Sequence, residues 1–136
     1  MAFLLDTNVV SELRKKRPHP GVAAWSDRHE AADFFISSLV IGEVRAGVEK
    51  LRRRDPRRAD DLDAWLDDLC VAFSDRVLPV SIEVAQEWGR LRARVGGPPI
   101  DSLMAATAGV HRLTLVTRNV GDFAGAGLSV VNPFDS

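Results

Sequence analysis

The sequence predicts an α/β fold in which helices cover a central, mostly parallel sheet of four or five strands, within a single domain over residues 1–136. Short apolar runs alternate along the chain with longer segments whose apolar residues recur at helical spacing. Parallel strands need long crossover connections, usually helices, so this alternation favours a parallel, helix-covered sheet. The length of 136 residues suits one domain with a substantial core.

The composition is that of a soluble globular protein, but its charges are unevenly distributed. Hydrophobic residues make up 46% of the chain, charged residues make up 27%, and the net charge is -1, which gives no general sign of a nucleic-acid-binding protein. Residues 45–58 nevertheless carry seven basic side chains, whereas residues 60–68 carry five acidic ones and no basic one. We expect the acidic stretch to be the solvated face of a helix.

The cysteine content and the hydropathy pattern bear on location. The single cysteine, Cys70, lies in an apolar helical context, excludes an intrachain disulfide and fits a reducing compartment. No apolar run reaches the length of a membrane span, and the chain enters its first strand without a basic leader. We therefore expect a cytoplasmic protein without membrane contact.

The first strand is the apolar run at residues 3–5, which stops at Asp6 because an unpaired charge cannot continue into a sheet core. A short helix over residues 9–14 follows, and the two prolines and the glycine within residues 15–21 predict a loop. A second helix begins at Val22, and residues 33–36 form the second strand.

The helix after the second strand carries an acid close to its apolar stripe. Ser37 and Ser38 offer an N-cap, and the stripe itself consists of Leu39, Val40, Val44, Val48 and Leu51. Glu43 falls within this stripe, so we expect it on or near the buried face, where it needs a cation or a polar pocket. The alternative is a glutamate at the edge of the stripe that reaches solvent.

The remaining chain continues the alternation after a break at Pro56. We expect a helix over residues 57–72 that buries Leu62, Trp65, Leu66 and Leu69, followed by a third strand over residues 76–80. The next helix is capped by Ser81, has Val84, Trp88, Leu91 and Val95 inward, and stops at Gly96-Gly97. A helix from Pro99 that contains Asp101 leads into a fourth strand over residues 113–116, and an edge strand covers residues 128–131.

Polar residues follow three of the predicted strands. They are Asp6-Thr7-Asn8 after the first strand, Ser37-Ser38 with Glu43 after the second, and Thr117-Arg118-Asn119 with Asp122 after the fourth, while Asp101 begins the helix that leads into the fourth strand. The carboxyl ends of parallel strands share one edge of the sheet, so we expect these side chains to gather there. Two simpler roles stay open: Asp6 as a helix N-cap, and Asp101 as an acid favoured by a helix dipole.

Gathered carboxylates repel one another and call for a counterion. Basic residues are scarce in this predicted lining, with Arg118 as the main candidate. Mg²⁺ or Mn²⁺ suits carboxylate and water ligands, so we expect a divalent cation here. Zinc is disfavoured, because the available soft or nitrogen ligands show no zinc-site spacing: His19, His29, His111 and Cys70.

This ordered set of residues resembles the PIN-domain ribonucleases, and within them the VapC-like toxins of bacterial toxin–antitoxin pairs. The matching features are Leu4-Leu5-Asp6-Thr7-Asn8, Glu43, Ile100-Asp101 with the alanine-rich helix behind it, Thr117-Arg118-Asn119, and the ending from Leu128 to Pro133. The resemblance extends over essentially the whole chain, although no single motif in it is specific.

The resemblance implies metal-dependent cleavage of RNA phosphodiester bonds. Asp6 and Asp101 would be the principal Mg²⁺ ligands, and Glu43 would bind the ion directly or through water. Thr7 and Thr117 would orient the carboxylates. It also implies a VapB-like antitoxin partner and a homodimer, neither of which is visible in the sequence itself.

One position departs from the family pattern. Many relatives carry a fourth acid directly after the Thr-Arg step, where this chain has Asn119. An asparagine offers a neutral oxygen but no charge, so Asp122 is the alternative for the fourth acidic position if the loop curls back. Arg118, with Arg45 and residues 14–17, is expected to guide the phosphate backbone, whereas residues 52–58 are expected to be solvated surface charge.

Two other functions remain open at this point. An aspartate-based phosphatase would use Asp6 as nucleophile, but such enzymes commonly carry a second aspartate where this chain has Asn8. A non-catalytic module that binds RNA or an antitoxin is the alternative outside enzymes. A nucleotide-binding fold is disfavoured, because no glycine-rich loop follows the first strand.

Overall fold

The computed structural model describes residues 1–135 and contains one five-stranded sheet in the order β3-β2-β1-β4-β5. All four strand pairs are parallel. The strands are β1 (Phe3–Leu5), β2 (Phe34–Ser37), β3 (Val77–Leu78), β4 (Thr114–Val116) and β5 (Val130–Val131). The predicted α/β class, the parallel sheet and the fifth strand at one edge are therefore confirmed.

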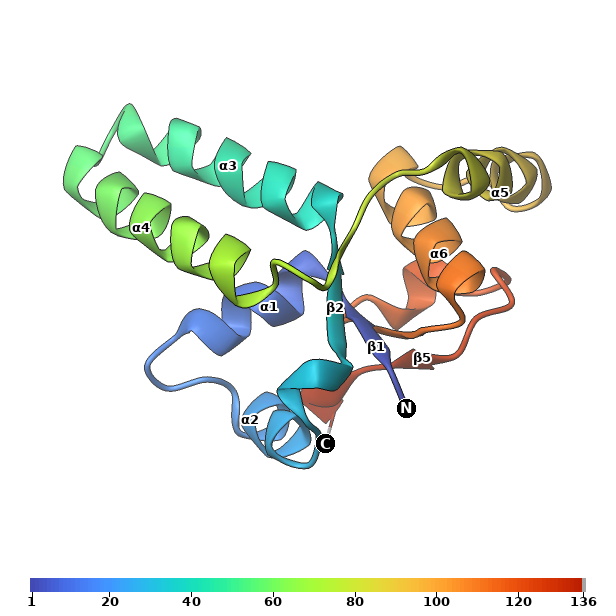
Figure 1. Ribbon diagram of the computed structural model, residues 1–136, viewed down its shortest axis with the longest axis horizontal. Helices are drawn as coiled ribbons and strands as arrows, with labels where there is room; N and C mark the ends of the chain where they lie inside the picture. Colours follow the sequence, from blue (N-terminus) through green and yellow to red (C-terminus); the bar gives the residue numbers. More distant parts are fainter. Residues whose placement is uncertain (136) are drawn as a thin grey trace.

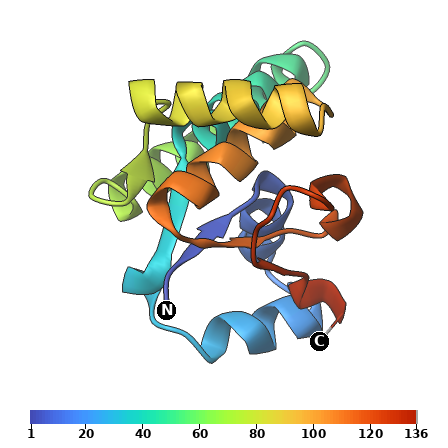
Figure 2. The same cartoon turned by 90° about the vertical axis from the view of Figure 1, so that its right-hand side faces the viewer.

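Six α-helices surround the sheet (Figures 1 and 2). They are α1 (Thr7–Arg14), α2 (Pro20–Asp27), α3 (Ser38–Arg52), α4 (Pro56–Ala72), α5 (Ile82–Arg94) and α6 (Pro99–His111), with short 3-10 turns η1 (Ala31–Asp33), η2 (Val120–Phe123) and η3 (Pro133–Asp135). Figure 1 shows α3 and α4 running side by side away from the sheet, and α5 and α6 forming a second pair on the opposite side of the view.

The central strand β1 lies in the middle of the core. Phe3, Leu4 and Leu5 are all buried, as expected for a strand covered by helices on both faces. Val40, Val44 and Val48 on α3 are buried in turn, as the predicted stripe requires. At the start of β1, the ring of Phe3 meets Trp25 of α2 edge-on and also lies near Phe34 of β2.

The third strand covers only Val77–Leu78 and is shorter than the predicted residues 76–80. Pro79 cannot donate a ladder hydrogen bond, so pairing stops at Leu78. The guanidinium of Arg76 donates to the carbonyl oxygens of Ala31, Phe34 and Ala72. This side chain therefore ties the end of α4 to the start of β2, while the Arg76 backbone carbonyl accepts a hydrogen bond from the Ile36 N–H just before β3 begins.

One further expectation is wrong. Val95 was expected to face inward on α5, but the helix ends at Arg94 and Val95 is 43% exposed. Cys70, the free cysteine, is exposed on α4. No helix within residues 1–135 combines the length and the apolar character needed to cross a lipid bilayer.

Candidate active site

Asp6 lies where β1 meets α1, and it is both a helix cap and part of the polar cluster. Its Oδ1 accepts a hydrogen bond of 2.7 Å from the Thr7 backbone N–H at the start of α1. Its Oδ2 accepts one of 2.7 Å from the Thr117 hydroxyl at the end of β4. Only 7% of Asp6 is exposed, so the capping role and the site role coexist in one nearly buried carboxylate.

Asn8 holds the ends of β1 and β4 together, a role that the sequence analysis missed. Its Nδ2 lies 3.3 Å from Asp6 Oδ2 and 3.4 Å from Thr117 Oγ1, while its Oδ1 accepts a hydrogen bond from the Arg118 backbone N–H. An amide can donate and accept at once, which suits this bridging position. The signal was present in the sequence, because Asn8 stands in the same polar triplet as Asp6.

Glu43 is exposed, so its expected position on or near the buried face is wrong. The core face of α3 is formed by Val40, Val44 and Val48. Glu43 precedes Val44 by one residue and therefore points about 100° away from it around the helix axis. Its Oε1 accepts a hydrogen bond of 2.5 Å from the Thr7 hydroxyl. Glu43 therefore reaches solvent at the edge of the stripe and is still directed toward the end of β1.

Asp101 lies in the first turn of α6 and is partly buried. Burial raises the pKa of its carboxyl, and the negative charges of Asp6, Asp122 and Glu43 raise that pKa further. Favourable interaction with the helix dipole is therefore not the dominant influence on this group. The structure brings Asp101 into one electrostatic neighbourhood with the other three acids.

Asn119 and Asp122 occupy the loop after β4. Asn119 directly follows the polar end of the strand, and its backbone N–H donates to Thr117 Oγ1. The 3-10 turn η2 brings Asp122 back, with its backbone N–H donating to the Asn119 carbonyl at 3.0 Å. A cavity of about 20 Å³ lies between Asp101 and Asp122, with room for one water-sized particle. Asp122, and not Asn119, contributes negative charge near Asp101.

Arg118 is exposed and held against the C-terminal segment. Its guanidinium lies 4.5 Å from the ring centroid of Phe134, and its carbonyl accepts from Asn132 Nδ2 at 3.4 Å. The Phe134 ring also packs 5.4 Å from His19. Nothing in the sequence pairs Arg118 with Phe134, because the contact depends on where the chain passes after β5.

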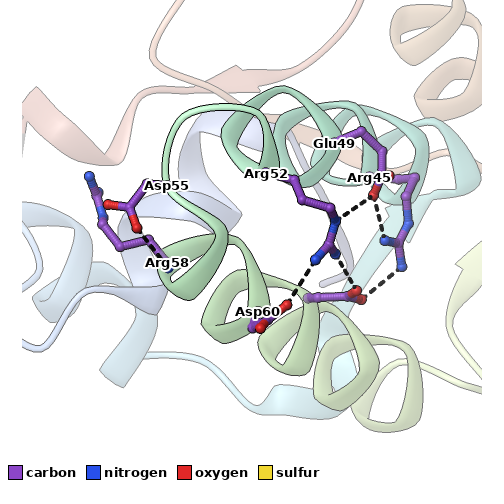
Figure 3. Close-up of polar contacts among 7 residues, drawn as sticks. Arg45, Glu49, Arg52, Asp55, Arg58 and Asp60 are labelled. Carbon is purple, nitrogen blue, oxygen red and sulfur yellow. Dashed lines mark hydrogen bonds and ion pairs between the residues drawn. The ribbon is translucent and has the colours of Figure 1, made fainter.

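Arg45, which was expected to guide a phosphate backbone, is occupied by acids. Its guanidinium pairs with Glu49 at 3.2 Å and with Asp63 at 2.9 Å (Figure 3). A charge neutralised by two carboxylates attracts phosphate weakly. Arg45 therefore belongs to the contact between α3 and α4. It does not belong to the edge of the sheet where Asp6, Glu43, Asp101 and Asp122 gather, which we call the acidic edge.

Comparison with known proteins now identifies the family. The family model for the PIN domain matches residues 3–125. The chain belongs to the PIN-domain family. This confirms the resemblance drawn from the sequence, and the match includes the four clustered acids Asp6, Glu43, Asp101 and Asp122.

Individual PIN-domain relatives match over nearly their whole length. Toxin FitB from Neisseria gonorrhoeae is 35% identical, with 97% of this chain and 98% of that protein aligned. VapC ribonuclease Y4jK from Sinorhizobium fredii is 31% identical, with 98% of each aligned. The crystal structure of FitAcB from Neisseria gonorrhoeae superposes with a TM-score of 0.89 at 33% identity, covering 98% of this chain and 99% of that one.

The oxygen donors of this PIN domain fit a hydrated metal ion better than an ion enclosed by side chains. Within residues 1–135, no three His, Cys, Asp or Glu side chains stand close enough together to enclose one ion directly. Asp6 and Glu43 are also held by neighbouring hydrogen-bond donors. Mg²⁺ usually takes one or two carboxylates and keeps several waters, so an edge of separated oxygen donors fits a hydrated ion. Of the two options expected for Glu43, this arrangement favours contact through water.

Proposed function

We propose that this protein is a Mg²⁺- or Mn²⁺-dependent endoribonuclease that cleaves RNA phosphodiester bonds as the toxin of a toxin–antitoxin pair. The observation that carries the proposal is the placement of four acids at one edge of the sheet: Asp6 and Glu43 both accept hydrogen bonds from Thr7, and Asp101 and Asp122 line one cavity. Burial and the charges of the other three acids raise the pKa of Asp101 accordingly. None of these acids forms an ion pair with a basic side chain of residues 1–135. A site that gathers unpaired carboxylates suits a divalent cation.

The names of two similar proteins support the same activity. One relative is named a toxin and another a VapC ribonuclease, and both align over nearly the whole of this chain. A toxin must be restrained in the cell that makes it. We therefore extend the proposal to a VapB-like antitoxin partner and to a homodimer.

Each acid has a proposed role in holding the ion. Asp6 and Asp101 would bind Mg²⁺ directly, and Glu43 and Asp122 would bind its water shell. When bound, the ion would supply Lewis-acid polarisation of a phosphoryl oxygen and a lower pKa for an attacking water. Asp122 takes the fourth acidic position in this proposal, since its charge acts on Asp101 whereas Asn119 brings none.

Neighbouring polar side chains would keep these carboxylates in place. Thr117 and Asn8 both donate to Oδ2 of Asp6 and so orient its carboxylate, which leaves the second lone pair of Oδ1 for the ion. Thr7 donates to Glu43 and so limits the freedom of a side chain that is otherwise exposed. Arg118, supported on the ring of Phe134, would contact a substrate phosphate while its guanidinium edge stays free.

Cleavage of RNA by the purified protein tests the proposal. We expect cleavage with Mg²⁺ or Mn²⁺ and none in excess EDTA. The Asp101→Asn variant should lose at least about 1,000-fold in rate, because it removes a charge that holds the ion. Asp68→Asn is the matched control, since Asp68 is an exposed aspartate on α4 and should leave cleavage unchanged.

Other results would select the alternatives. Uncut RNA together with normal Mn²⁺ binding would support a non-catalytic binding module. Release of phosphate from p-nitrophenyl phosphate without RNA cleavage would support a phosphatase with Asp6 as nucleophile. Unfolding of Asp6→Asn would mean that the capping bond to Thr7 is the main role of Asp6.

A further inference from the structure

Helix α3 presents three distinct faces. Val40, Val44 and Val48 face the core. Arg45 and Arg52 face α4, where they meet its acids. Residues at i, i+4, i+7 and i+11 lie on one side of a helix. On α3 and the turn that continues it, this spacing defines a third, outer face formed by Glu43, Gly47, Lys50 and Arg54. This outer face begins at the acidic edge of the sheet and ends at the turn between α3 and α4.

The acids of the α3–α4 hairpin are neutralised by two arginines. Arg45 pairs with Asp63 at 2.9 Å, and Arg52 pairs with Asp60 at 2.8 Å and with Asp63 at 3.0 Å (Figure 3). Glu49 lies within 4 Å of both arginines, at 3.2 Å from Arg45 and 3.9 Å from Arg52. These five side chains cancel much of one another's charge on the side of α3 that faces α4.

The turn that follows keeps its positive charge. Five basic side chains are exposed and form no ion pair within residues 1–135: Lys50, Arg53, Arg54, Arg57 and Arg58. We call this set the basic turn. The only acid within residues 50–59 is Asp55, whose carboxylate caps α4 by accepting from the Arg58 backbone N–H.

Helix dipoles explain only part of the basic turn. Lys50 and Arg53 are at the C-terminal end of α3, where cations are favoured. Arg57 and Arg58, however, occupy the first turn of α4, at the end of the helix dipole that disfavours cations. Five like charges close together also repel one another. The cluster therefore disfavours the isolated fold, and a polyanion bound to it would relieve that repulsion.

The basic turn lies within reach of a nucleic-acid strand that starts at the acidic edge. Glu43 and Arg54 are eleven residues apart along α3 and its continuation, which corresponds to about 16 Å of helix. Phosphates in a stacked strand repeat at roughly 3.4 Å along the axis, so about five nucleotides bridge this distance. Ala46 and Gly47 lie between the two points and leave the path free of bulk and of negative charge.

We propose that the basic turn binds the RNA phosphate backbone about five nucleotides from the bond positioned at the acidic edge. The identity of the strand as RNA rests on the proposed function, whereas the binding itself does not require cleavage. The turn therefore favours substrates with several nucleotides on one side of the cleaved bond over short fragments. RNA fits this face better than an acidic polypeptide. Every nucleotide of an RNA strand that continues from the acidic edge carries a phosphate, so its charges reach the basic turn at regular intervals.

The test measures binding of fluorescent oligouridylates to the full-length protein in EDTA, so that no cleavage occurs. One probe has about 4 nucleotides and the other about 20, and each is titrated at several NaCl concentrations. Arg53→Gln with Arg54→Gln should weaken binding of the long probe about tenfold. The short probe should bind more weakly than the long one and should also lose affinity, because the metal-free acidic edge repels phosphate and leaves the basic turn as its binding surface. The slope of log K against log salt for the long probe should fall by about 1.4, the value for two lost single-strand phosphate contacts.

Matched variants separate this surface from a general effect of charge. Arg28→Gln with Arg94→Gln removes two exposed, unpaired arginines outside the basic turn and should change long-probe binding by less than about twofold. Arg57→Gln with Arg58→Gln should repeat the loss seen with the first pair. Circular dichroism confirms that each variant is folded, which is expected because glutamine is a good helix former.

Several outcomes would overturn the proposal. Unchanged binding of the long probe by both basic-turn pairs, or an equal loss in the control pair, would exclude a dedicated backbone site. Equally tight binding of polyglutamate of matched length would make the turn a site for acidic polypeptides. Absence of RNA cleavage with retained length-dependent binding would contradict the proposed function and leave this surface intact.

Discussion

Carboxylates at the acidic edge of the sheet and in the α3–α4 hairpin have neighbours of opposite charge. In the hairpin, Asp63 accepts hydrogen bonds from Arg45 and Arg52, and the bond from Arg45 is the main cause of its lowered pKa. At the acidic edge, Asp101 has other acids for neighbours, and its pKa is raised. One residue type thus shifts in both directions, because its neighbours decide which protonation state is favoured.

This difference separates acids that stabilise the fold from acids that are available to bind a ligand. Paired acids such as Asp60 and Asp63 stay ionised, and arginines of the same chain compensate their charge. Asp101 and Asp122 repel each other, so their proximity disfavours the fold unless a cation binds. Perturbed carboxylates of this kind are a physical sign of a functional site.

After the loss of cleavage expected for Asp101→Asn, the next largest effect comes from changing the fourth acid. Asp122→Asn should lower the rate of RNA cleavage about 10- to 100-fold, because it removes negative charge next to Asp101 and weakens ion binding through water. Asn119→Ala is the control and should change the rate by less than about threefold. The measurement is the single-turnover cleavage rate over a range of Mn²⁺ concentrations.

A greater loss in Asn119→Ala than in Asp122→Asn would reverse this assignment. Asn119→Asp sharpens the comparison, since it places a carboxylate directly after the Thr-Arg step. If the Asn119 position faces the ion, this variant should bind Mn²⁺ more tightly than the unchanged protein.

A smaller effect concerns the stability of the metal-free protein. The pKa of Asp101 is raised above its ordinary value of 3.8, so the folded state binds more protons than the unfolded chain between that value and the higher folded one. Stability therefore falls as the pH rises through this window, and the penalty is complete above it. Asp101→Asn removes the penalty and should raise the Tm in EDTA at neutral pH by about 2 °C.

Thermal unfolding in EDTA at a series of pH values checks this prediction. The advantage of Asp101→Asn should shrink as the pH falls toward the ordinary aspartate pKa, because protonation then removes the same charge. Asp68→Asn serves as control and should show no such trend. A variant that is less stable than the unchanged protein at neutral pH would contradict the electrostatic cause.

The smallest effect is expected in the hairpin. Asp63→Asn removes a partner of both Arg45 and Arg52, and these side chains are solvent-accessible. The Tm should fall by no more than about 2 °C, less so in high salt, with the cleavage rate unchanged. A large loss of cleavage would show that the hairpin network supports the acidic edge, which would remove the distinction between the two regions.

The fold was largely predictable because its signals are local. The apolar run that ends at Asp6, the helical stripe that includes Val40 and Val44, and the proline-led start of α6 each appear within a few neighbouring residues. The parallel sheet followed from their alternation, and its shared edge predicted that Asp6 and Asp101 would approach each other. Their roles with a metal ion remain predictions.

Errors occurred where burial depends on a partner element. Glu43 was expected on or near the buried face, but the exact face of α3 that packs inward depends on where the sheet and α4 lie. Val95 fell outside its helix because α5 ends one residue earlier. The contact of Arg118 with Phe134 and the bridging of two strands by Asn8 join residues far apart in the chain.

By itself, the sequence determined the order of strands and helices, the family resemblance and the identity of the acids, since hydrophobic periodicity and capping act over one or two turns. Only the tertiary structure decided which charges are paired. The arginines of residues 45–58 divide into two that neutralise acids on α4 and four that remain exposed in the basic turn, because ion pairing depends on distances between side chains of different helices. In the same way, the pKa of Asp101 is set by neighbours that the folded sheet brings to one edge.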